Sequence, residues 1–261
     1  MADVIAFAEE FKKKADKQIN RWAVFGSKYK DAATWGKAAA AYLKLAAASA
    51  YAEAENFYKK ISVTDAISCF DQAVNQFMEI GNFNMAAVYC MEIGELYEVG
   101  LPDVEKSTAY YKRAADLFQS AEVSRSAFEC MQRVAQFSAQ LEQYPRAIEI
   151  YENLAHQSLN NKFLNYLVKG YLLNAGLCHL YEVDVFTISN ALEHFEEMDP
   201  TFSGTHEYKF LADLAASVDK EDVQRFTVVF REGHSMIRQD PWKTRFLLRV
   251  KKMLKAKEDE Q

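Results

Sequence analysis

The sequence is poor in the two residues that most often make tight turns. Only 9 glycines and 4 prolines occur among its 261 residues. A β-sandwich or barrel needs a turn signal after each short strand, so this scarcity argues against those folds. Alanine, leucine, glutamate, lysine and glutamine are frequent instead, and these residues lose little side-chain freedom in a helix. The composition therefore predicts an all-α fold.

Long apolar runs and an excess of positive charge are also missing. No apolar stretch approaches the roughly 18–20 residues that a membrane-spanning helix needs. Residues 1–20 contain Glu9, Glu10 and several lysines where a secretory signal would have an apolar centre. The formal net charge is -6, whereas a nucleic-acid binder needs a basic face, so we expect no nucleic acid among the partners.

The spacings that hold metals, phosphates or catalytic groups are absent as well. There is no CxxC pair, no HExxH, no glycine-rich phosphate loop and no close pair of histidines. Each cysteine lies in an apolar helical pattern, which favours buried reduced thiols in a cytoplasmic protein. The cysteines are Cys69, Cys90, Cys130 and Cys178. We expect no catalytic residue, no metal site and no cofactor.

A self-similar pattern begins after Tyr29. Its aromatic residues Phe70, Tyr111, Tyr151 and Phe195 recur at steps of 41, 40 and 44 residues, each near small or apolar partners. A period in this range indicates stacked antiparallel helical hairpins that bury their faces against one another. The pattern predicts a tetratricopeptide-like right-handed solenoid, with repeat units longer than the roughly 34 residues of the standard repeat.

The C-terminal part is less regular. Helices are expected at residues 205–217 and 220–237, and a last basic helix from about Asp240 to Lys257. We therefore divide the chain into a solenoid of residues 1–203 and a C-terminal helical bundle of residues 204–261. The last helix should bury an apolar stripe and leave a basic face in solvent. That stripe consists of Trp242, Phe246, Leu247, Val250 and Leu254.

Four segments, in order along nearly the whole chain, resemble the soluble NSF attachment protein family. They are 101–106, 139–152, 177–179 and 240–252. The resemblance implies a non-catalytic adaptor that binds SNARE complexes and recruits the hexameric AAA ATPase NSF. The ATPase then disassembles the complexes after membrane fusion, in vesicle-mediated transport such as that between ER and Golgi. Compared with the family, this chain lacks about one helical hairpin near the N-terminus.

A predicted first helix from Asp3 to Asn20 is followed by a segment, residues 21–28, that breaks the helical period. This segment is expected to be an exposed loop bearing Trp22, Val24 and Phe25. Residues 1–30 carry a net charge of +3, and aromatic rings among lysines suit an anionic membrane surface. The resemblance implies a membrane-attachment loop here and a cytoplasmic, peripherally membrane-associated protein. The alternative is that Trp22 and Phe25 pack on the first hairpin.

The resemblance also implies two charged surfaces for protein partners. The basic positions expected to face the SNARE complex are Lys59, Lys60, Arg133 and Lys169. The acidic positions expected to recruit the ATPase are Asp184, Asp219, Glu221, Asp222, Glu258, Asp259 and Glu260. Val88 and Glu129 stand where alpha-type members carry lysines, and Glu260 stands where the family has a penultimate leucine. A repeat scaffold for a different helical or peptide partner is the alternative function.

Overall fold

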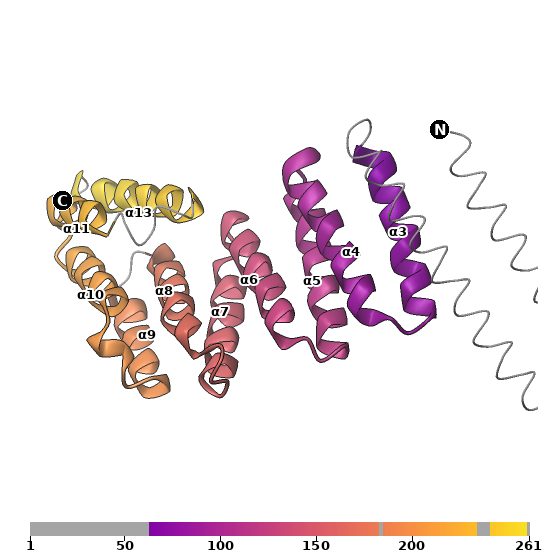
Figure 1. Cartoon of the computed structure of the whole chain (residues 1–261). Coiled ribbons are helices and arrows are strands. Elements are labelled where there is room, and N and C mark those ends of the chain that lie inside the picture. Colours follow the sequence, from indigo (N-terminus) through magenta and orange to yellow (C-terminus); the bar gives the residue numbers. More distant parts are fainter. Residues whose placement is uncertain (1–62, 183–184, 234–240, 260–261) are drawn as a thin grey trace, which may run out of the picture. The chain divides into compact units, whose positions relative to one another are not determined.

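The computed structural model describes residues 63–182, 185–233 and 241–259, and every regular element in these ranges is a helix (Figure 1). This confirms the all-α fold that the composition predicts. The expected first helix and the loop with Trp22, Val24 and Phe25 lie outside the described residues.

The chain divides into two compact units, Met1–Cys130 and Met131–Gln261. The described part of the first unit holds consecutive helices, with α4 packed against both α3 and α5. They are α3 (Val63–Glu79), α4 (Phe83–Glu95), the π-helical turn η1 (Leu96–Gly100) and α5 (Val104–Ser120). Helix α6 (Ser124–Gln140) begins in this unit and ends in the second. The expected boundary near residue 203 stays a prediction.

The second unit continues the pattern, since α8 contacts α7 and α9, and α10 contacts α9 and α11. Its helices are α7 (Tyr144–Leu159), α8 (Val168–His179), α9 (Val185–Met198), α10 (His206–Asp219), α11 (Val223–Glu232) and α13 (Pro241–Asp259). Short 3-10 turns precede or follow them: η2 (Asn165–Leu167), η3 (Leu180–Glu182) and η4 (Phe202–Gly204).

The aromatic residues of the repeat pattern occupy equivalent places. Phe70, Tyr111, Tyr151 and Phe195 lie on α3, α5, α7 and α9, and each is at most 5% exposed. These four helices alternate with α4, α6, α8 and α10, so each aromatic residue belongs to the first helix of a hairpin. The repeat period read from the sequence is therefore the period of the hairpins.

Helix α8 is the centre of the second unit. Its residues from Tyr171 to Cys178 are all buried, as expected for a helix surrounded by α7, α9 and α10. Gly176 allows the close approach of α10, because a Cβ at this position would lie 2.5 Å from Cδ1 of Leu211.

Several hairpin turns share one backbone form. Gly81, Glu122, Glu142 and Glu221 have φ values between 52 and 76°, which is the left-handed region that follows many helices. At Glu142, its own N–H donates to the carbonyl of Ala139, and the next N–H donates to that of Ser138. The other three turns repeat this pair of hydrogen bonds. They are Schellman turns, which satisfy the last carbonyls of the preceding helix.

Helix α13 runs across the end of the hairpins instead of along them (Figure 1). It contacts α11, and Phe246 meets Tyr144 of α7 with ring centroids 5.2 Å apart. The predicted apolar stripe from Trp242 to Leu254 is confirmed, since all five of its residues are at most 5% exposed. Lys243 departs from the expected solvated basic face, because it is only 5% exposed and lies beside the Trp242 ring.

Candidate protein-binding surfaces

The cysteines do not form a reactive site. All four are free and buried, as the apolar pattern around them predicts. Burial raises the pKa of Cys90 to about 11 and that of Cys130 to about 12. Burial also raises the pKa of Cys178, against the opposing charge of Lys243. A thiol becomes nucleophilic as its pKa falls, so these shifts point to packing roles.

The histidines of the described ranges show no arrangement for catalysis or metal binding. No group of three or more His, Cys, Asp or Glu side chains there could hold a metal ion. His179 is half-buried, and its Nε2 lies 3.3 Å from Glu152 Oε1 between α8 and α7. This contact joins two neighbouring helices, which is a packing role.

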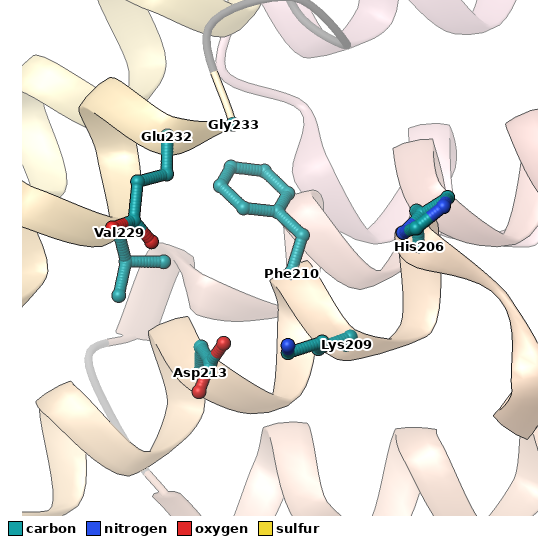
Figure 2. A pocket seen from close by; sticks show the side chains of 7 residues that line it. All are labelled: His206, Lys209, Phe210, Asp213, Val229, Glu232 and Gly233. Carbon is teal, nitrogen blue, oxygen red and sulfur yellow. The ribbon is translucent and has the colours of Figure 1, made fainter.

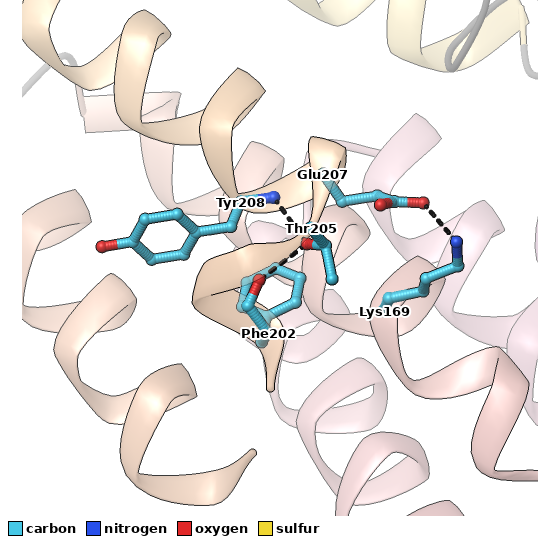
Figure 3. Close-up of polar contacts among 5 residues, drawn as sticks. All are labelled: Lys169, Phe202, Thr205, Glu207 and Tyr208. Carbon is cyan, nitrogen blue, oxygen red and sulfur yellow. Dashed lines mark hydrogen bonds and ion pairs between the residues drawn. The ribbon is translucent and has the colours of Figure 1, made fainter. Parts of the chain in front are cut away.

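Two of the four expected SNARE-facing cations are described, and both contact other side chains. Lys169 of α8 forms an ion pair with Glu207 of α10, at 3.2 Å between Nζ and Oε1 (Figure 3). The lysine side chain remains 55% exposed and Glu207 only 16%. Arg133 donates to Gln136 Oε1 at 3.1 Å and stands over the Phe137 ring. Lys59 and Lys60 lie outside the described residues.

The start of α10 holds Glu207 in place. Thr205 is the N-cap, and its hydroxyl accepts a hydrogen bond from the N–H of Tyr208 at 3.1 Å (Figure 3). The same hydroxyl donates to the carbonyl of Phe202 at 2.7 Å. Because an acidic side chain in the first turn is stabilised by the helix dipole, Glu207 suits this position and can fix Lys169. Lys169 therefore has a structural role, since its ion pair links α8 to α10.

Val88 and Glu129 differ from the lysines expected of the family, and the structure gives them local roles. Val88 is half-buried on α4. Glu129 is exposed on α6, where its Oε1 lies 3.1 Å from Nε of Arg125. A lysine at position 129 would place a second cation beside Arg125 in place of this ion pair.

The expected acidic positions are partly brought together by the α10–α11 turn. Asp219 ends α10, Glu221 holds the left-handed turn position, and Asp222 caps α11 by accepting from the N–H of Arg225 at 2.7 Å. Asp219 and Asp222 are exposed, and Glu221 is half-buried. With Lys220 between them, these four residues carry a net charge of -2. We name residues 219–222 the acidic turn.

The other four acidic candidates lie elsewhere in the sequence. Glu258 and Asp259 belong to the last turn of α13. Asp184 and Glu260 lie outside the described residues. The turn therefore supplies three of the seven acidic positions named from the sequence.

Two exposed aromatic residues were not identified as site residues from the sequence. Phe163 is 87% exposed and Tyr166 is 62% exposed, on the loop between α7 and α8. The N–H of Phe163 donates to Asn161 Oδ1 at 3.0 Å, and Leu164 beside it is 3% exposed. The buried leucine and this asparagine turn position the two rings outward. Aromatic side chains in an asparagine-rich break of the helical period are the signal that could have identified them.

A shallow cavity of about 400 Å³ lies between α10 and α11 (Figure 2). Phe210 and Val229 form its buried apolar part, and Gly233 closes one side. Its rim has both signs of charge, with Lys209 beside Asp213 on α10 and Glu232 on α11. Asp213 also lies 3.5 Å from Arg225. The mixed charge and open shape indicate no particular small-molecule ligand.

No helix in the described ranges has the length and apolar character to cross a membrane. The candidate site is a set of exposed and half-buried side chains on a helical scaffold: Phe163 and Tyr166, Arg133 of α6 and Lys169 of α8, and the acidic turn. Such surfaces suit contacts with other macromolecules better than chemistry on a small substrate.

Comparisons with known proteins show which family this chain is similar to. A family model described as "Soluble NSF attachment protein, SNAP" matches residues 43–255. An alpha-soluble NSF attachment protein of Vitis vinifera is 50% identical, covering 100% of this chain and 99% of the relative. One from Mus musculus is 33% identical over 95% of this chain and 87% of its own length. A probable vesicular-fusion protein sec17 homolog of Schizosaccharomyces pombe is 33% identical, over 82% and 74%.

The alignment with the Vitis vinifera protein also bears on the expected missing hairpin. It runs over 286 positions, 25 more than the 261 residues of this chain. That relative therefore has at least 25 residues without a counterpart here, a length within the roughly 20–45 residues of one repeat unit. Hairpin periodicity, the four matching segments and the match over 43–255 agree, and the chain belongs to the soluble NSF attachment protein family.

Proposed function

We propose that the protein is a non-catalytic adaptor that binds SNARE complexes and recruits an NSF-type hexameric ATPase to disassemble them. The observation that carries this function is the family match over residues 43–255, supported by full-length similarity to an NSF attachment protein. The name vesicular-fusion protein of the Schizosaccharomyces pombe relative supports a role in membrane fusion. The helical scaffold and its exposed charged and aromatic side chains are compatible with an adaptor.

The SNARE contact is proposed to use Arg133, Lys169 and the exposed pair Phe163 and Tyr166. Exposed aromatic side chains held on an ordered loop are typical anchors of protein interfaces. The cations would complement acidic helices, with a contribution that weakens as salt rises. The family resemblance implies a SNARE-binding role for Lys59 and Lys60 as well.

The ATPase contact is proposed to use the acidic turn together with Asp184 and the C-terminal acids Glu258, Asp259 and Glu260. Fixed carboxylates around a tight turn would attract a basic surface and raise the rate of encounter. We also propose that the protein works in the cytoplasm and attaches peripherally to membranes through Trp22, Val24 and Phe25. Liposome flotation that is unchanged by Trp22→Ser with Phe25→Ser would refute this attachment.

One reconstitution tests the adaptor function. A SNARE bundle carrying a fluorophore and quencher is mixed with an NSF-type ATPase, ATP and the protein. We expect fluorescence to rise only when the protein, the ATPase and ATP are all present. Binding of the SNARE bundle without its disassembly would favour the alternative scaffold function. Chemical turnover of a substrate by the protein alone would point to an enzyme.

Variants in the same assay separate the two partner surfaces. Phe163→Ser with Tyr166→Ser should weaken SNARE pull-down by at least about tenfold, as for truncated interface anchors. Phe186→Ser is the matched control, because Phe186 is 75% exposed on α9. Asp219→Asn with Glu221→Gln should reduce ATPase recruitment and leave SNARE pull-down intact. Its control, Glu149→Gln with Glu197→Gln, removes two exposed acids elsewhere in the second unit.

A further inference from the structure

The solvent side of α13 carries a line of positive charge. Arg245, Arg249, Lys252 and Lys255 are all exposed, and spacings of four, three and three residues place them on one helix face. Leu248 lies among them and is 44% exposed. We name these five residues the α13 stripe. At about 1.5 Å per residue, it extends over about 15 Å.

Folding does not account for the stripe. The opposite face of α13 makes the contacts with the rest of the unit through Phe246, Leu247 and Val250, which are buried. Like charges three or four residues apart destabilise a helix, and no acidic residue occurs from Pro241 to Lys257. Arg249 pairs with Glu142 of the α6–α7 turn. Among the described residues, Arg245, Lys252 and Lys255 have no acidic partner.

Apolar side chains interrupt this charge where water would favour polar ones. Leu248 is in the middle of the stripe, and Met253 on its flank is 37% exposed. Cationic side chains with apolar residues between them are typical of helices that lie at a membrane surface, where the apolar groups enter the interface.

We propose that the α13 stripe binds the anionic headgroups of a membrane surface. The lysines and Arg245 are long and are held by no ion pair in the described ranges, so they can adapt to mobile headgroups. An acidic protein surface would need matching shape, and the stripe is a single convex helix face. Residues 241–261 carry seven cations and three acids, a net charge of +4, in a chain of net charge -6. An anionic bilayer would therefore orient the molecule with this helix toward it.

This contact is separate from the loop with Trp22 and Phe25. The loop is proposed to act through its aromatic rings, whereas the stripe acts through charge and should be sensitive to salt. It also goes beyond the adaptor function, because it requires neither a SNARE complex nor the ATPase.

Vesicle co-sedimentation of the full-length protein tests the stripe. Vesicles of phosphatidylcholine with phosphatidylserine are compared with vesicles of phosphatidylcholine alone. We expect wild-type binding to need the anionic lipid and to fall steeply with added salt. Arg245→Gln with Lys252→Gln and Lys255→Gln should lower the apparent affinity by roughly 100-fold, since each cation near such a surface contributes about fivefold.

The matched control removes three exposed cations from other helices and loops of the second unit, by Arg146→Gln, Lys162→Gln and Arg231→Gln. It has the same net charge as the stripe variant and should bind nearly as wild type. Equal losses in both variants, or equal binding to neutral vesicles, would overturn the proposal. So would a stripe variant that binds vesicles normally but loses SNARE or ATPase binding, because the stripe would then be a protein contact. Two further measurements test the stripe without the triple variant. Vesicle binding of the wild type should weaken as salt is added, and Leu248→Ser should weaken it at constant salt.

Discussion

Two glycines of α8 differ in their surroundings and should respond oppositely to the same substitution. A Cβ at Gly170 would have nothing within 4 Å, whereas one at Gly176 would lie 2.5 Å from Cδ1 of fully buried Leu211. We expect Gly170→Ala to stabilise the protein by about 0.5–1 kcal/mol through helix propensity. Gly176→Ala should destabilise it by roughly 1–2 kcal/mol through overpacking. Urea unfolding of both variants measures the difference in unfolding free energy. Equal stabilisation by both would show that Leu211 and α10 can shift to accept the extra methyl group.

Residue identity predicted burial better than it predicted partners. Phe70 and Tyr151 are core residues because small and apolar neighbours recur around them at helical spacing, and both are buried. Lys169 was expected to face a protein partner, and the structure also pairs it with Glu207, 38 positions later in the sequence. Lys243 looked like part of the basic face, yet it is buried. Such pairings depend on tertiary contacts that the local pattern does not encode.

At the scale of the element, several hairpin turns cannot be located from glycine positions in the sequence. Glycine occupies the left-handed position of the turn at Gly81, but glutamate occupies it at Glu122, Glu142 and Glu221. A residue with a Cβ costs roughly 1–2 kcal/mol there. The hydrogen bonds of the Schellman turn and the packing of the helices on either side keep the conformation. No rule based on glycine could find the turn at Glu122.

Substitutions at one of these turns should follow an order opposite to that in a helix. We expect Glu122→Gly to stabilise the protein by up to about 1 kcal/mol, because relief of the left-handed strain exceeds the added chain entropy. Glu122→Val should destabilise it, since a β-branched residue is disfavoured at positive φ. Gln119 is exposed and lies one turn earlier in α5. At this position glycine should be less stable than both glutamine and valine, by about 1 kcal/mol relative to glutamine. Thermal unfolding of the four variants gives the order, and the same order at both positions would contradict it.

On the scale of the whole molecule, the repeat period predicted the hairpins because each hairpin buries the same kind of residue at the same place. Among the C-terminal helices, α10 and α13 begin within two residues of their expected starts. Helix α11 spans Val223–Glu232 instead of the expected residues 220–237. The partner surfaces were less accessible to prediction. Charged positions such as Asp219 came from resemblance. The break around Phe163 can be read from the sequence, but the sequence does not show that Leu164 is buried there and Phe163 exposed.

A stack in which helices contact mainly their sequence neighbours should respond locally to damage. Phe77 of α3 is 2% exposed and stacks on Tyr89 of α4, with ring centroids 5.4 Å apart. Phe77→Ala should lower the stability of this region by about 3–5 kcal/mol. Amide hydrogen exchange should then become faster in α3 and α4 and stay unchanged in α9, α10 and α11.

The converse change tests the same property in the second unit. Leu214 of α10 is fully buried, and Leu214→Ala should quicken exchange in α8 to α11 but not in α3 or α4. Local responses follow from two units that are each compact, since opening of one hairpin exposes chiefly its neighbours. Faster exchange along the entire chain in either variant would mean that the units unfold together. A local response would mean that damage to the hairpins of one unit leaves the helices of the other unit folded.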